Sequence, residues 1–162
     1  MKNILALLSL LLLLSGCAAY GPIDSPDFDS YLTSMLPNDD RTILLQGAGE
    51  WVPNTRGFTD VKSSFISSPT DLIPGALVIT DRTIYVAQWD DSLSKFQIMK
   101  KFDFSQLGSV DLYEYGLNRR ATVQLKDFTT HSFRFVTGSS GYLDKEKTVK
   151  LVQILKAEIG DI

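Results

Sequence analysis

Residues 75–85, GALVITDRTIY, indicate the fold of this chain more directly than any other stretch. Two runs of alternating apolar residues flank Asp81-Arg82, with the apolar positions at Leu77, Ile79, Ile84 and Val86. A period of two places these side chains on one face of a β-strand, and a two-residue interval between such runs is typical of a hairpin. We therefore predict two antiparallel strands, 76–80 and 83–89, joined by a tight turn.

The β pattern continues outward on both sides of this hairpin. Upstream, residues 42–48 form a predicted strand with Ile43-Leu44-Leu45 at its apolar centre. Between it and the hairpin, the segment from Gly49 to Pro74 contains three prolines and many serines and threonines, which predicts a long loop. Downstream, short connections indicate antiparallel neighbours, and four more strands are predicted at 96–104, 109–115, 121–127 and 131–137.

One long amphipathic helix follows the strands, beginning near Asp144 and ending at Gly160. A twisted antiparallel sheet that folds over leaves an open end, and a single amphipathic helix can cover that end. We therefore expect a mainly β domain, an antiparallel β-barrel of about seven strands capped by a C-terminal helix.

Three stretches resemble the GRAM and pleckstrin-homology (PH-like) superfamily of β-barrel-plus-helix domains. They are the hairpin at 75–85, the step through Leu-Gly-Ser-Val within Phe102–Val110, and Lys126-Asp127-Phe128 leading to Phe133–Phe135. The resemblance spans Arg41 to Ile159 and implies the same architecture. Eukaryotic members often bind phosphoinositides, but a shared fold does not carry a shared function.

The N-terminus has the layout of an export signal. Lys2 precedes an apolar run from Ile4 to Leu14, which is too short to span a bilayer. The run ends in Leu14-Ser15-Gly16-Cys17, which resembles the lipobox of bacterial lipoproteins. The resemblance implies lipidation of Cys17 and cleavage after Gly16. We therefore divide the chain into a signal peptide (1–16), a lipidated tether with a short helix (17–40) and a PH-like domain (41–162).

The tether contains a second, shorter helical pattern. Ser25-Pro26-Asp27 is typical of a helix start, and apolar residues follow at helical spacing at Phe28, Tyr31, Leu32, Met35 and Leu36. This helix could lie on a membrane surface or bind a partner, but it has no Lys or Arg on its polar face. We therefore expect it to pack on the domain.

Charge and cysteine content narrow the function classes. The chain of 162 residues has a formal net charge of −3, and loss of residues 1–16 removes Lys2, which makes the mature part slightly more acidic. This argues against non-specific nucleic-acid binding. Cys17 is the single cysteine, so the fold forms without disulfides.

The sequence does not indicate an enzyme, a metal site or a cofactor. His131 is the single histidine. It has the same strand parity as Phe133 and Phe135 and lies near a predicted strand start, which predicts a packed or rim imidazole rather than a catalytic base. The acidic pairs Asp39-Asp40 and Asp90-Asp91 lack the spacing of a calcium loop and are expected to be solvated turn residues.

Two sets of residues are candidates for binding. Lys100, Lys101, Arg119 and Arg120, with Lys95 and Lys126, could form a basic patch for lipid head groups or an anionic partner, although acidic residues are interleaved with them. Trp51, Phe58 and Phe65 could anchor a protein partner if they are exposed; alternatively they cover the barrel.

These observations lead to two functional hypotheses. The first is a non-enzymatic, lipid-anchored envelope lipoprotein whose PH-like module mediates protein interaction or scaffolding at the membrane surface. Ala18, rather than an aspartate, follows the cysteine, which implies the periplasmic face of an outer membrane if the source has one. The second is a lipid or small-ligand carrier, which a cavity inside the barrel would favour and a barrel filled by Phe and Leu would disfavour.

Overall fold

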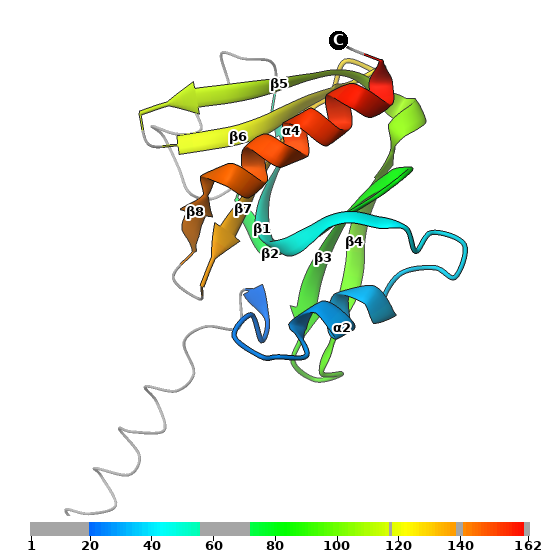
Figure 1. Ribbon diagram of the computed structural model, residues 1–162, viewed down its shortest axis with the longest axis vertical. Coiled ribbons are helices and arrows are strands. Elements are labelled where there is room, and N and C mark those ends of the chain that lie inside the picture. Colours follow the sequence, from blue (N-terminus) through cyan, green and yellow to red (C-terminus); the bar gives the residue numbers. More distant parts are fainter. Residues whose placement is uncertain (1–19, 56–71, 117, 139–140, 161–162) are drawn as a thin grey trace, which may run out of the picture.

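A computed structural model describes residues 20–55, 72–116, 118–138 and 141–160. Its elements are α2 (Phe28–Ser34), β1 (Ile43–Thr55), β2 (Ile73–Thr80), β3 (Thr83–Asp90), β4 (Lys95–Asp103), the 3₁₀ turn η3 (Phe104–Gln106), β5 (Leu107–Tyr115), β6 (Asn118–Leu125), β7 (Thr130–Thr137), β8 (Tyr142–Asp144) and α4 (Lys145–Ile159). The strands pair in the order β4-β3-β2-β1-β7-β6-β5, and the short β8 pairs with β7. Every pairing is antiparallel, so the predicted mainly β fold with a C-terminal helix is confirmed (Figure 1).

The hairpin predicted at residues 75–85 is β2 and β3. Ile79 pairs with Ile84 across the turn. The Thr80 hydroxyl oxygen accepts hydrogen bonds from the backbone N–H groups of Thr83, at 3.0 Å, and Arg82, at 3.3 Å. A side-chain oxygen that satisfies two turn amides in this way fixes the local conformation, so the hairpin is specified by its own residues.

The long loop predicted from Gly49 is partly wrong, because β1 continues to Thr55 and β2 begins at Ile73. β1 is a central strand that pairs with β2 on one side and β7 on the other. A Cβ at Gly49 would lie 2.6 Å from Leu77 Cδ1 and 2.9 Å from the Arg134 carbonyl oxygen. Gly49 therefore allows close packing within strand β1 and does not end the strand.

The predicted closed barrel is also corrected. β4 and β5 follow one another in the chain, but each ends the strand path and neither pairs with the other. The turn η3 separates them, with Gln106 Oε1 accepting from the Asp103 N–H at 3.2 Å. The chain thus changes direction through a helical turn instead of a hairpin, which leaves an open, strongly bent sheet.

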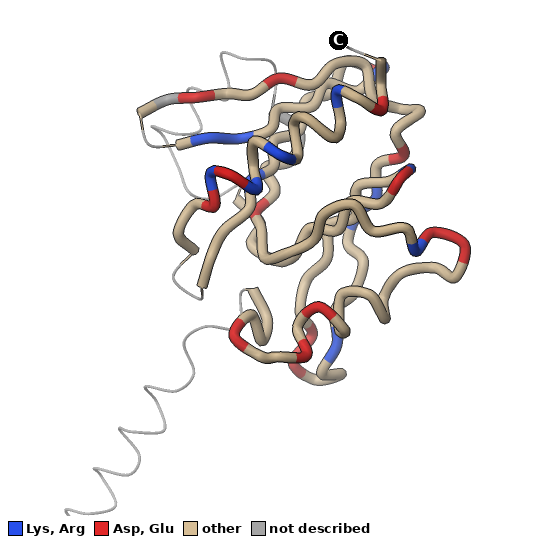
Figure 2. Tube along the Cα trace, viewed as in Figure 1, with Lys and Arg blue, Asp and Glu red and all other residues tan. Residues whose placement is uncertain are grey.

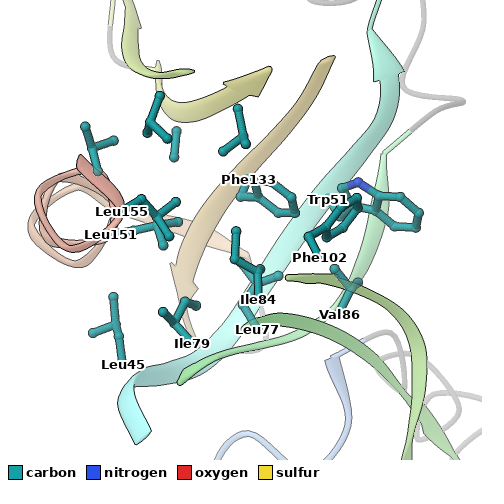
Figure 3. Close-up of a cluster of buried hydrophobic side chains, with 14 of the residues drawn as sticks. Leu45, Trp51, Leu77, Ile79, Ile84, Val86, Phe102, Phe133, Leu151 and Leu155 are labelled. Atoms are coloured by element: carbon teal, nitrogen blue, oxygen red, sulfur yellow. The ribbon is translucent and has the colours of Figure 1, made fainter. Parts of the chain in front are cut away.

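Helix α4 packs on the concave side of this sheet, against β5, β6 and β7 (Figure 1). Leu151 and Leu155 are fully buried and join a core that includes Leu77, Ile79 and Phe133 (Figure 3). The helix ends are as predicted: the Asp144 side chain accepts from the Lys147 N–H at 2.9 Å, and Gly160 ends the helix at φ 72°.

The N-cap is a testable contributor to stability. Asp144→Ala removes the side-chain acceptor for the first turn of α4, so we expect a loss of about 1 kcal/mol in the free energy of unfolding, measured by urea denaturation. Gln153→Ala changes an exposed position in the same helix and should alter this free energy by less than about 0.5 kcal/mol. Equal effects of the two changes would contradict the role of Asp144.

Helix α2 lies on the other face of the β1–β4 part of the sheet. Phe28 and Leu32 are buried there, and the Phe28 ring meets Phe96 edge-on with 5.6 Å between ring centroids. The expectation that this helix packs on the domain is confirmed. Among the described residues, no helix is both long enough and apolar enough to cross a membrane.

Candidate functional site

One side of the bent sheet is occupied by α4, and the opposite end of the core carries a surface cavity of about 330 Å³, here termed the mouth pocket. Figure 3 shows Trp51 and Phe102 at the end of the core away from Leu151 and Leu155. The pocket is lined by Trp51, Pro53, Lys100, Lys101, Phe102, Gln106, Leu125, Asp127, Thr129 and His131. These residues come from β1, β4, η3, the end of β6, the β6–β7 turn and β7.

Three aromatic rings form the floor of the mouth pocket. The ring centroids of Phe102 and His131 are 4.7 Å apart, and Trp51 lies 5.9 Å from both. His131 is buried, as its parity with Phe133 and Phe135 predicted. Aromatic contacts at these distances stabilise a rigid surface, so the floor is preorganised.

The indole N–H of Trp51 is buried and makes no hydrogen bond. The other tryptophan differs, because Trp89 Nε1 donates to Asp91 Oδ1 at 2.9 Å. A buried donor without an acceptor costs about 1–3 kcal/mol, and native proteins rarely leave one without a reason. Trp51 therefore brings a hydrogen-bond donor without an acceptor to the lining of the mouth pocket.

The lining of the mouth pocket has two lysines and one carboxylate, Asp127, and Lys101 Nζ also lies 4.0 Å from Asp103 Oδ1. Lys100 Nζ lies 5.8 Å from the centroid of the Phe102 ring, and Lys101 also lines the pocket. Burial, followed by the nearby Lys100 charge, lowers the pKa of His131 to about 4. His131 is therefore neutral at physiological pH, and the lysines supply the positive charge.

The structure brings together three of the predicted binding residues and separates the others. Trp51, Lys100 and Lys101 share the mouth pocket, and Trp51 is a floor residue that is only 9% exposed. Arg119 and Arg120 lie on β6, near the other end of the strand path from β4. Phe58 and Phe65 lie outside the described residues.

The candidate basic residues do not gather in one patch, in line with the interleaved acidic residues in the sequence. Basic and acidic residues alternate over several elements (Figure 2). Arg119 pairs with Glu114, with 2.7 Å between Nε and Oε1. Arg120 is buried, and its burial, with the nearby Arg134 charge, lowers its pKa to about 10. Neither arginine lines the mouth pocket.

A buried ionic cluster beside Arg120 was not foreseen from the sequence. Glu50 is 4% exposed, accepts from Arg134 Nε, and accepts from the Tyr20 hydroxyl at 2.5 Å. Burial and Glu50 raise the pKa of the Tyr20 phenol. Glu50 and Arg134 are partners in the β1–β7 register, so their pairing becomes visible only when the strand alignment is known. The cluster ties the tether to the sheet.

A second cavity, of about 440 Å³, has five acidic residues among the twelve that line it. Its residues are Pro37, Asp39, Asp40, Asp81, Arg82, Thr83, Tyr85, Lys101, Asp103, Phe104, Ser105 and Glu158. The Tyr85 hydroxyl donates to Asp40 Oδ2 at 2.6 Å, and burial together with this carboxylate raises the pKa of Tyr85 to about 12. Asp40 is therefore buried rather than the solvated turn acid predicted from the sequence. Among the described residues, no group of three or more His, Cys, Asp or Glu could hold a metal ion.

Large side chains fill the interior between the sheet and α4. Phe102, Phe133, Phe135, Leu77 and Leu151 are all 2% exposed or less. Both cavities described above lie at the edge of this core. A filled interior is the feature that disfavours the carrier hypothesis.

Comparisons with known proteins give structural relatives but no family assignment. No family model and no curated protein matches the chain. Among solved structures, the chain is similar to "The hSac2 domain from human phosphoinositide phosphatase Sac2", with a TM-score of 0.47 and 14% identity over 82% of this chain and 78% of that one. Because fold and function are separable, that name assigns no activity to this chain.

Proposed function

We propose that this chain is a non-enzymatic, lipid-anchored envelope lipoprotein whose β domain binds a protein partner through the mouth pocket. The observation that carries the proposal is the convergence of Trp51, Lys100 and Lys101 on one concave surface with a preformed aromatic floor. Aromatic residues and concave apolar surfaces with a few placed polar groups are the usual basis of recognition.

The anchor half of the proposal rests on the lipobox and on the position of Tyr20. Tyr20 is the third residue after Cys17, and its hydroxyl is bound to the buried Glu50. Three residues span at most about 11 Å when fully extended. A lipid on Cys17 would therefore hold the domain close to the membrane surface.

The binding half can be tested by photo-crosslinking in intact cells of the source organism. A photoreactive amino acid at Lys101 should crosslink to one defined protein. Because Lys101 lines both cavities, a photoreactive amino acid at Thr129, which lines the mouth pocket but not the second cavity, should give the same product. The control places the same photoreactive amino acid at Lys150, which is exposed on α4, and this variant should not give that product. Equal products from Lys101 and Lys150, or none from Lys101, would contradict the proposal.

The anchor half predicts the behaviour of a Cys17→Ala variant. Without the thiol no acyl chain can be attached, so we expect an unprocessed precursor that incorporates no radiolabelled palmitate and lacks the lipid-modified N-terminal peptide in mass spectra. Ser15→Ala retains the thiol and is the control, which should be lipidated normally. Palmitate incorporation that persists in Cys17→Ala would refute the anchor assignment.

A further inference from the structure

We infer that the mouth pocket binds a carboxylate group presented by an extended segment of a partner protein. The inference rests on the proposed function and adds the chemistry of what is recognised. Its basis is that Trp51, whose buried N–H has no acceptor, lines the same pocket as Lys100 and Lys101, and that no strand among the described residues pairs with the outer edge of β4.

The hydrogen-bond donors of the pocket would be best satisfied by a negatively charged acceptor. The Trp51 N–H can be satisfied only by an acceptor atom, because indole nitrogen has no acceptor function. Lys100 and Lys101 are also donors without acceptor capacity. A carboxylate has two acceptor oxygens and one negative charge, so it can take the indole N–H and an ammonium N–H together.

The same lining disfavours a highly charged phosphate ligand. No arginine lines the pocket, although arginine is the residue best suited to bidentate phosphate contacts. Asp127 adds a negative charge to the lining, while Trp51, Pro53 and Leu125 contribute apolar surface. This combination fits a single anionic charge attached to an apolar body.

Strand β4 indicates why the carboxylate belongs to an extended protein segment. β4 ends the strand path, so no strand among the described residues pairs with its outer edge. In the β3–β4 pairing Val86 lies opposite Lys100 and Ala87 opposite Ile98, so Met99 between them has no partner on β3. Ile98 and Met99 are 39% and 53% exposed. Unpaired strand edges accept extended peptides through main-chain hydrogen bonds. A peptide along β4 would bring a carboxylate to Lys100.

Titration followed by NMR tests this directly, because the chain has only two indole N–H groups, Trp51 and Trp89. The probes are benzoate, with benzamide as its neutral match, and the peptide Ac-IVIE-NH₂, with Ac-IVIQ-NH₂ as its neutral match. Benzoate and Ac-IVIE-NH₂ should shift the Trp51 indole proton, whereas both neutral probes should not. The Trp89 signal should stay in place, since its N–H is already bonded to Asp91.

Two comparisons of affinity test whether the carboxylate comes from a peptide and whether Lys100 binds it. The peptide should bind about tenfold more tightly than benzoate, because added main-chain hydrogen bonds contribute on the order of 1 kcal/mol each. Lys100→Gln should weaken benzoate binding about tenfold, since it removes a charged donor. Lys95→Gln, at the start of β4 and outside the pocket, is the matched control and should leave binding unchanged.

Several outcomes would overturn the inference. These are no shift of the Trp51 signal with either carboxylate, equal shifts with the neutral probes, or tighter binding of inorganic phosphate than of benzoate. If the peptide bound no more tightly than benzoate, the claim that the carboxylate is presented by an extended protein segment would be overturned. A crosslink at Lys101 that persists while the titrations are blank refutes this inference alone. Carboxylate binding without any crosslink refutes the proposed function, and with it the assignment of the carboxylate to a partner protein.

Discussion

A Glu50→Gln variant is expected to lose about 3 kcal/mol in the free energy of unfolding. Glu50 is almost fully buried and is the acceptor for both Arg134 and the Tyr20 hydroxyl. It also offsets the charge of Arg120, whose pKa Arg134 and burial lower. Removing one partner of a buried ion pair leaves the other charge uncompensated, which typically costs 3–5 kcal/mol. Equilibrium urea denaturation measures the change.

The exposed pair Glu114–Arg119 provides a matched control. Its atoms are 2.7 Å apart, but the two side chains are 50% and 38% exposed. Surface pairs contribute 0–1 kcal/mol, so Glu114→Gln should change the free energy of unfolding by about 1 kcal/mol or less. If the two substitutions had equal effects, the buried cluster would not be the structural tie between tether and sheet described above.

Phe133→Ala is expected to destabilise the domain by about 3–5 kcal/mol. The Phe133 ring is 1% exposed and meets Phe102 edge-on, with 5.5 Å between centroids. It lies in the core shared by the sheet and α4 (Figure 3). Truncating a buried Phe removes apolar burial and leaves a cavity, and both effects contribute to the loss. Thermal and urea denaturation should give consistent values.

The control is the other phenylalanine near the β6–β7 turn. Phe128 is 81% exposed and adopts a positive φ of 69°. Phe128→Ala removes no buried contact, so we expect a change within about 0.5 kcal/mol. A loss from Phe133→Ala as small as that from Phe128→Ala would mean that Phe133 does not occupy the packed core.

Local sequence signals were sufficient where residues specify their own structure. The hairpin at 75–85 was predicted because period-two alternation and a two-residue turn act over a few residues, and Thr80 confirms the turn. Helix α4 was predicted because Asp144 and Gly160 are capping residues, each at its expected end. In both cases short-range chemistry determines the element.

The sequence-based predictions were wrong or incomplete where contacts between distant parts of the chain determine the local structure. Gly49 and Pro53 discourage a strand locally, yet β1 continues past both, since close packing on Leu77 requires glycine at position 49. The short β8 exists only because it pairs with β7, and no alternation of its own marks three residues as a strand. The Glu50–Arg134 pair likewise depends on the β1–β7 register.

For the candidate site, too, part was predictable from local sequence and part depends on long-range contacts. Its residue types were identifiable from the sequence, since Trp51, Lys100 and Lys101 are natural binding residues. Their grouping was not, because it depends on the bend that brings the end of β1 next to β4. The orphaned indole N–H is a property of the packed structure and has no sequence signature.

The central claim is that the mouth pocket is where a protein partner binds. The most direct test is to synthesise the partner segment recovered by crosslinking at Lys101 and titrate it into the isotope-labelled domain. We expect the Trp51 indole signal to shift and the Trp89 signal to stay in place. A shift of Trp89 alone, or no shift of Trp51 at saturating peptide, would contradict the central claim.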